Sequence, residues 1–190
     1  MLNRAVFLDR DGTINEEVHH LSAVDQFRIL PTAVEAIRLL NQSHFRVIVI
    51  TNQSVVARGI ISEQTLADIH LFMIEQLEAL GAHIHGIYYC PHHPTAGKGS
   101  LKITCDCRKP QPGMLLQAAA EQNIELSQSF MVGDKISDLA SGLAAGCKTV
   151  LVQTGYGKET EKLVEGRADL PNMIAPNLLE AAQWILQQTA

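Results

Sequence analysis

The sequence predicts an α/β protein, with a Rossmann-like parallel sheet that carries helices on both faces. Short β-branched runs alternate with longer amphipathic segments along the chain. One run, residues 47–50, is Val-Ile-Val-Ile, which is typical of a strand buried on both faces of a parallel sheet. Of the 190 residues, 46% are apolar and 18% are charged, enough apolar material for one packed core. We therefore expect a single domain over residues 1–190.

The first half of the chain contains three predicted strands and two predicted helices. Residues 5–8 form a short apolar strand, and residues 31–42 have apolar side chains at helical spacing. The run 45–50 is the buried strand. Ser62 is placed to cap a helix that extends to about Leu80, just before Gly81, and residues 84–89 form the third strand.

The second half continues the alternation after a long irregular segment. Residues 90–111 have no helical or strand pattern, and a loop of that length usually has a function or an internal cross-link. Pro112 suits the first turn of a helix that ends by Asn123. The remaining predicted elements are strand 130–132, helix 136–145, strand 149–152 and a final amphipathic helix over 177–188.

Charge and hydropathy exclude several classes of function. The net charge is −5 and no run of five basic residues occurs, so the sequence does not suggest nucleic-acid binding. No segment approaches the roughly 20 apolar residues of a membrane span. The first residues do not resemble a signal peptide, so we expect a cytoplasmic protein whose cysteines are reduced unless a metal holds them.

Polar groups follow each predicted strand, at the edge of a parallel sheet where ligands gather. These groups are Asp9-Arg10-Asp11-Gly12-Thr13, Thr51-Asn52-Gln53-Ser54, Arg108-Lys109 after the long loop, and Gly133-Asp134-Lys135 with Asp138 beyond. Carboxylates, a hydroxyl and cations together are what phosphoryl transfer requires. The groups therefore predict a phosphoryl-transfer site.

The residue types suggest a role for each side chain. Asp9 suits a nucleophile that forms an aspartyl-phosphate, and Asp11 suits the acid/base partner. Asp9, Asp134 and the main-chain carbonyl of Asp11 suit Mg²⁺, which prefers oxygen ligands. Thr51 and Lys109 suit the stabilisation of phosphoryl oxygens.

Each group has a simpler explanation when it is taken alone. Asp9 and Asp11 fit an ordinary turn, whereas a calcium loop needs Gly at its sixth position and here Gly12 is the fourth. Lys109 alone fits a surface lysine, and Asp134 alone fits a helix cap. The simple explanations do not account for all four groups following successive strands, so the joint pattern favours the phosphoryl-transfer site.

On these motifs the chain resembles the haloacid dehalogenase superfamily over about residues 4–155, which implies that the first strand is central in the sheet. Within it, the chain is similar to the heptose bisphosphate phosphatases. The segments that carry this closer resemblance are 9–15, 51–54 with 57–59, 88–94 and 105–110. Histidinol-phosphate phosphatases share much of this pattern and stay an alternative, as does a zinc-stapled binding module without activity.

The closer resemblance implies that a small phosphorylated sugar is the partner, with hydrolysis of the 7-phosphate of D-glycero-D-manno-heptose 1,7-bisphosphate. It also implies no large cap domain and an open cleft, which suggests a monomer. Arg108 is implied to recognise the second phosphate. The implied substrate contacts are Asp9, Arg10, Asp11, Glu17, Val18, His19, His20, Thr51, Asn52, Gln53, Ser54, Arg108, Lys109 and Lys135.

The long loop contains a candidate zinc site. Cys90, His92, Cys105 and Cys107 supply three thiolates and an imidazole, which suit tetrahedral Zn²⁺ in a structural role. From spacing alone, free or disulfide-bonded cysteines stay open and His93 is an alternative ligand. The family resemblance favours zinc and His92.

The remaining cysteine and histidines have no partner motif in the sequence. We expect Cys147 to be a small buried hydrophobe. The other histidines, expected to be structural or surface residues, are His44, His70, His83 and His85.

Overall fold

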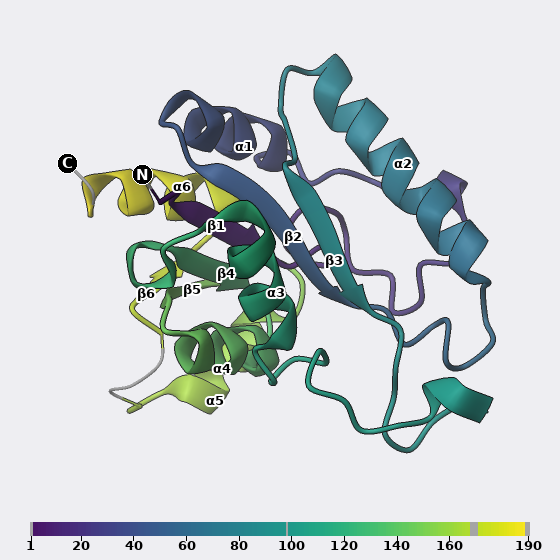
Figure 1. The fold of residues 1–190 in the computed structure, drawn as a ribbon. Coiled ribbons are helices and arrows are strands. Elements are labelled where there is room, and N and C mark those ends of the chain that lie inside the picture. The colour runs from purple at the N-terminus through teal and green to yellow at the C-terminus, as the bar shows by residue number, and fades with distance from the viewer. Residues whose placement is uncertain (1, 98, 168–170, 189–190) are drawn as a thin grey trace.

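A computed structural model describes residues 2–97, 99–167 and 171–188, and its centre is a six-stranded sheet (Figure 1). The strand order is β3-β2-β1-β4-β5-β6, and every neighbouring pair is parallel. The bounds are β1 Ala5–Leu8, β2 Arg46–Asn52, β3 Gly86–Cys90, β4 Phe130–Gly133, β5 Lys148–Val152 and β6 Met173–Ala175. The first strand lies between β2 and β4, so the predicted parallel sheet with a central first strand is confirmed.

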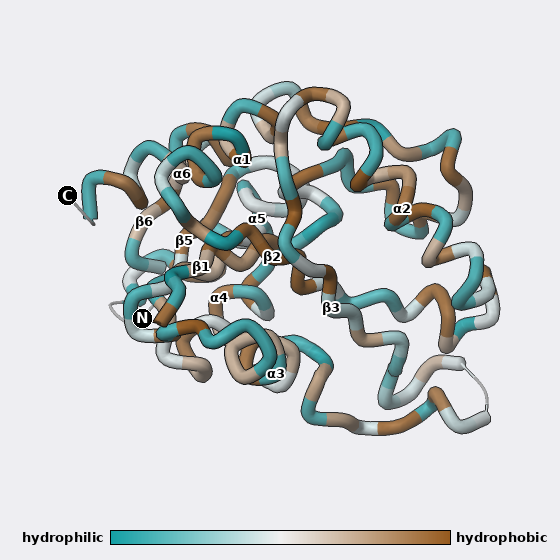
Figure 2. Tube along the Cα trace, turned by 45° about the horizontal axis from the view of Figure 1, so that its top comes forward, coloured by the Kyte–Doolittle hydropathy of each residue, from teal (hydrophilic) through white to brown (hydrophobic). Residues whose placement is uncertain are grey.

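Helices cover both faces of the sheet, as alternation along the strands requires. In β1, Val6 and Leu8 pack into one core and Ala5 and Phe7 into the other. The first core is closed by α1 Ala33–Gln42, α2 Glu63–Ala79 and α6 Leu178–Gln187. The second face carries α3 Gly113–Gln122, α4 Ile136–Ala145 and, beside α4, α5 Gly157–Val164. Figure 2 shows hydrophobic stretches running through the central strands.

Most predicted elements are present, with small shifts at their ends. Helix α4 has the predicted bounds, and the Ser62 hydroxyl accepts the N–H of Thr65 at the start of α2. The predicted helix over 31–42 begins only at Ala33, because Pro31 lies in the preceding turn. The second and third strands end at Asn52 and Cys90, one or two residues later than predicted, so their polar ends still pair within the sheet.

Two elements were not predicted from the sequence. Strand β6 has only three residues, and α5 is a short helix with a charged sequence, Gly-Lys-Glu-Thr-Glu-Lys-Leu-Val. The strand is too short to show a pattern, and the apolar side chains of the helix are two neighbours at its end, Leu163 and Val164. Short 3₁₀ turns occur at Val24–Gln26, Gly99–Leu101 and Leu126–Gln128. In the described part of the chain, no helix is long and apolar enough to cross a membrane.

Candidate active site

The turn after β1 is closed by its own main chain. The carbonyl of Arg10 accepts the N–H groups of Thr13, Ile14 and Asn15, so the chain reverses directly after Asp9. Gly12 has φ +85°, a conformation that favours glycine, and a Cβ there would collide with the carboxylate of Asp134. The glycine therefore lets the turn approach the end of β4.

Three buried carboxylates meet at this point. Ligand oxygens of Asp9, Asp134 and Asp138 all lie within 4.8 Å of one another. Burial and the charge of Asp9 raise the pKa of Asp134 to about 8. Its Oδ1 has no hydrogen-bond partner among the described residues, although Lys135 Nζ lies 3.6 Å away. A buried carboxylate oxygen without a donor fits a hard divalent cation such as Mg²⁺.

Lys109 provides the cation closest to this cluster. Its Nζ lies 2.9 Å from Asp9 Oδ1 and 2.7 Å from Asp138 Oδ1, and it donates to the carbonyl of Ile50 at 2.7 Å. Burial would lower the pKa of Lys109, but the charges of Asp138 and Asp9 outweigh burial and raise it. Asn52 fixes the main chain of Lys109, accepting its N–H and donating to its carbonyl, both at 3.1 Å.

Asp11 lies beside the cluster and is held by neutral and charged donors. Arg10 Nη2 donates to Asp11 Oδ2 at 2.8 Å and Arg10 Nε to Oδ1 at 3.1 Å, while Asn15 and Gln53 donate one bond each. Burial would raise the pKa of Asp11, but Arg10, Asn15 and Gln53 together lower it. Gln53 also donates to Thr51 Oγ1 at 2.8 Å, which leaves the Thr51 hydroxyl proton for a ligand.

The Arg10 side chain does not face the cleft. It is fully buried and directed towards Asp11 and His70, so a substrate contact by Arg10 is left to its main chain. The main-chain N–H of Arg10 donates to Asp9 Oδ1 at 2.8 Å.

Two residues of the predicted substrate loop, 17–20, contact residues at or next to the site. Glu17 Oε2 lies 2.8 Å from Lys135 Nζ, and His19 Nδ1 lies 2.6 Å from the hydroxyl of Tyr156. Val18 and His20 are exposed, and Ser54 is half-buried. Of the contacted residues, Lys135 lines the small polar cavity, so Glu17 is one contact away from it.

The cysteine loop forms a compact cluster next to the site. Cys107 Sγ lies 3.2 Å from both Cys90 Sγ and Cys105 Sγ, and 3.3 Å from His92 Nδ1. These separations are too long for disulfide bonds and resemble the edges of a small tetrahedron. The donor set and its spacing fit Zn²⁺. Cys147, by contrast, is buried in an apolar cluster, and burial raises its pKa to about 12.

Arg108 and His93 directly follow two residues of this cluster, Cys107 and His92. Arg108 Nη1 donates to the carbonyl of His92 at 3.0 Å, which ties the side chain of Arg108 to the loop. His93 lies outside the four-residue group and instead has its Nε2 3.4 Å from Arg58 Nη2.

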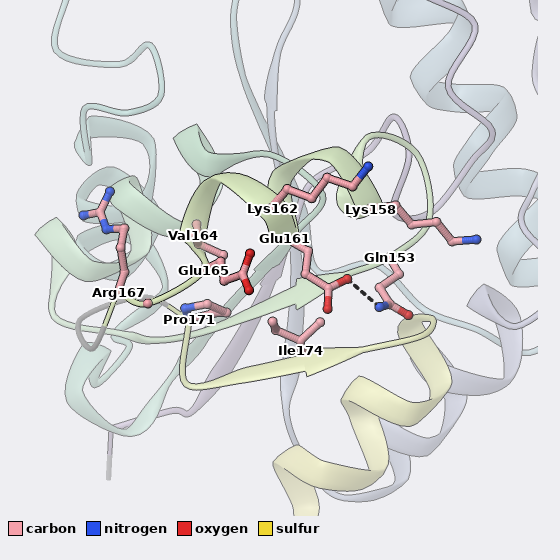
Figure 3. A pocket seen from close by; sticks show the side chains of 10 residues that line it. Gln153, Lys158, Glu161, Lys162, Val164, Glu165, Arg167, Pro171 and Ile174 are labelled. Atoms are coloured by element: carbon pink, nitrogen blue, oxygen red, sulfur yellow. Dashed lines mark hydrogen bonds between the residues drawn. The ribbon is translucent and has the colours of Figure 1, made fainter.

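Two cavities differ in what surrounds them. A small cavity of about 50 Å³ is lined by Ser137 and by seven polar side chains from the groups that follow the strands and the long loop. The seven are Asp9, Asp11, Thr51, Asn52, Lys109, Lys135 and Asp138. A larger cavity of about 660 Å³ lies between α5 and β6 (Figure 3), where Gln153 donates to Glu161. Its mixed Lys and Glu lining does not include the carboxylate cluster, so the smaller cavity is the candidate active site.

Sequence reasoning did not assign some residues of this site. Thr154 donates to the carbonyl of Gly12 at 2.6 Å, and the N–H of Tyr156 donates to Asp134 Oδ2 at 2.8 Å. Both residues follow β5, so the rule that singled out the ends of other strands would have found them. His70, expected to be structural or a surface residue, is buried against Arg10, and the sequence has no local signal for that contact.

Comparisons with known proteins show the family to which the chain belongs. Residues 106–181 match the HAD-hydrolase-like family. The chain is 44% identical over 180 residues to the D-glycero-beta-D-manno-heptose-1,7-bisphosphate 7-phosphatase of Pasteurella multocida (strain Pm70), covering 91% of this chain and 97% of that one. It is 38% identical to the enzyme of the same name from Escherichia coli (strain K12), over 98% and 90% of the two chains.

A solved structure agrees in fold. The D,D-heptose 1.7-bisphosphate phosphatase from B. bronchiseptica, complexed with magnesium and phosphate, has a TM-score of 0.85 at 36% identity, covering 97% of this chain and 99% of that one. The family resemblance inferred from the motifs is therefore confirmed. The chain belongs to the family of the D-glycero-beta-D-manno-heptose-1,7-bisphosphate 7-phosphatases, within the HAD-like hydrolases.

Proposed function

We propose that this protein hydrolyses the 7-phosphate of D-glycero-D-manno-heptose 1,7-bisphosphate through an aspartyl-phosphate on Asp9. The single observation that carries the proposal is the buried Asp9 carboxylate, paired with Lys109 at 2.9 Å and grouped with Asp134 and Asp138. A carboxylate in such a setting has a fixed orientation and faces a small polar cavity. The names of the relatives supply the substrate class.

Asp9 carries the covalent chemistry in this proposal. Its Oδ1 already meets Lys109 Nζ and the N–H of Arg10, so we assign the attack on phosphorus to Oδ2. The new bond joins Oδ2 to phosphorus while the bond from phosphorus to the sugar oxygen breaks. Lys109 and the Thr51 hydroxyl, both at the cavity, stabilise the phosphoryl oxygens.

Asp11 moves the proton in both halves of the reaction. It protonates the departing sugar oxygen and then removes a proton from the water that attacks the aspartyl-phosphate, which restores Asp9 and releases phosphate. The anionic phosphoryl group raises the proton affinity of Asp11, offsetting the donors that lower its pKa in the free site.

We propose Mg²⁺ as the catalytic cofactor, held by Asp9, Asp134 and the main-chain carbonyl of Asp11. Asp138 completes the acidic group but already pairs with Lys109 at 2.7 Å. When bound, Mg²⁺ supplies positive charge that lets one anion approach another.

We propose structural Zn²⁺ at Cys90, His92, Cys105 and Cys107. The loop that carries them leads directly to Arg108, which we assign to the second phosphate because a planar guanidinium suits an oxyanion. Metal analysis of purified protein tests the site; about one zinc per chain supports it, and none contradicts it. We further propose a cytoplasmic monomer, whose four free cysteines stay reduced or metal-bound.

Histidinol phosphate is the second candidate substrate, because the motifs are shared with phosphatases of that compound. A cationic amine favours an acidic wall, whereas a second phosphate favours Arg108 beside the loop. Comparison of kcat/KM on both heptose bisphosphate anomers and histidinol phosphate separates the two. A preference for histidinol phosphate would overturn the proposed substrate and leave the chemistry at Asp9 intact.

A further inference from the structure

Within the described part of the chain, the least exposed cationic side chain is Arg10, which pairs with Asp11 and does not line the small polar cavity. Arg10 is fully buried, and its guanidinium spreads its donors over two partners. Nε and Nη2 face both oxygens of Asp11, whereas Nη1 lies 3.1 Å from Nε2 of His70. His70 comes from α2, 60 residues further along the chain. The side chains therefore form a chain from His70 through Arg10 to Asp11.

The chemistry of the two groups fixes the direction of the His70 bond. A guanidinium only donates, so Nε2 of His70 must accept, and the imidazole is neutral with its proton on Nδ1. Burial first, and the charge of Arg10 second, lower the pKa of His70 to about 3, which keeps it neutral. The ring also packs edge-on against Tyr89, with centroids 5.7 Å apart. His70 is thus a fixed acceptor with a defined orientation.

We propose that His70 is a positioning residue for Asp11: it holds the guanidinium of Arg10 in the plane that orients the Asp11 carboxylate towards the leaving group. The inference rests on the proposed acid/base role of Asp11. Without an acceptor at Nη1, Arg10 has a buried donor to satisfy elsewhere, so its guanidinium shifts from its present plane although Nε and Nη2 still meet Asp11. Asn15 and Gln53 still donate to Asp11, so the orientation is weakened and not abolished.

The experiment separates a misplaced acid from a weakened fold. Hydrolysis of p-nitrophenyl phosphate needs little help at its leaving group, whereas the heptose bisphosphate releases a poor alkoxide. Since kcat/KM reports the steps up to departure of the alcohol, only the alkyl substrate depends on the acid in this parameter. We expect His70→Leu to lower kcat/KM for the heptose bisphosphate about tenfold. For p-nitrophenyl phosphate the change should stay within about twofold.

A conservative variant tests whether another hydrogen-bond acceptor at position 70 restores activity. The side-chain oxygen of His70→Gln reaches the place of Nε2 and should restore the alkyl activity. His70→Asn is too short to reach Arg10 and should behave like His70→Leu, which it replaces if the leucine variant fails to fold. His85→Leu is the control for loss of a partly buried histidine, because His85 lies just before β3, outside the Arg10 contact, and accepts the N–H of Val47.

Asp11→Asn distinguishes failure of the inference from failure of the proposed function. It should lower kcat/KM about 100-fold or more on the alkyl substrate and far less on the aryl one. If Asp11→Asn shows this difference and neither His70→Leu nor His70→Asn does, the positioning role is wrong. If Asp11→Asn lowers both substrates equally, the acid/base role is wrong and the inference fails with it.

Discussion

Replacement of Lys109 by methionine tests how strongly the charge network holds the site together. The variant keeps most of the side-chain volume but removes the ammonium that meets Asp9 at 2.9 Å, Asp138 at 2.7 Å and the carbonyl of Ile50 at 2.7 Å. Two buried carboxylates then face each other without this cation. Loss of one partner of a buried ion pair costs about 3–5 kcal/mol, and we expect Lys109→Met to destabilise the metal-free protein by that amount.

Urea unfolding in EDTA measures this free energy, because a bound divalent cation would compensate the carboxylates. Asp138→Asn removes one of the two opposing charges, so the same lysine substitution should cost about 1–3 kcal/mol less in that background. A cost below about 1 kcal/mol for Lys109→Met alone, the range of an exposed pair, would show that Lys109 does not stabilise the buried carboxylates. Equal costs in both backgrounds would show that Asp138 and Lys109 do not interact.

Three further predictions concern the turn, the loop and the buried histidine. Gly12→Ala should lower the free energy of unfolding by about 1–3 kcal/mol and weaken Mg²⁺ binding measured by calorimetry, because the added Cβ meets the Asp134 carboxylate. Gly59→Ala is the control for backbone strain alone, because Gly59 has φ +69° and open space around it. Cys107→Ser should lower the zinc content and raise KM for the bisphosphate more than for p-nitrophenyl phosphate; equal effects would contradict a link between loop and substrate. Burial and the neighbouring guanidinium lower the pKa of His70 to about 3, so as the pH falls below about 6.5 this histidine is protonated in the unfolded chain before it is protonated in the folded protein. About 2 kcal/mol of the free energy of unfolding should therefore be lost between pH 7 and 5. Urea titrations of His70→Gln should not show this loss.

The sequence predicted the sheet and the strand-end groups because both follow local rules. Buried parallel strands need β-branched runs, and ligand groups gather where such strands end. Asp9, Thr51 and Asp134 were found this way: Asp9 and Asp134 belong to the carboxylate cluster, and Thr51 lines the same cavity as Asp9. Strand β6 was missed because three residues are too few to show a pattern, and helix α5 because its apolar side chains are two neighbours at its end, Leu163 and Val164.

Contacts between distant segments were beyond sequence reasoning. Nothing near His70 indicates that it accepts from Arg10, because the contact depends on where α2 crosses the sheet. The same holds for Tyr156, whose N–H reaches Asp134 only when the end of β5 lies beside the end of β4. A single sequence indicates which polar groups follow each strand. Only the tertiary structure shows which of these groups are oriented by residues from distant segments.

The covalent step at Asp9 is the centre of the account, and a rapid acid quench followed by peptide mass analysis tests it most directly. During turnover with the heptose bisphosphate, the peptide containing Asp9 should carry one phosphoryl group, and Asp9→Asn should carry none and lack activity. A phosphoryl group on another residue, or full activity of Asp9→Asn, would contradict the account.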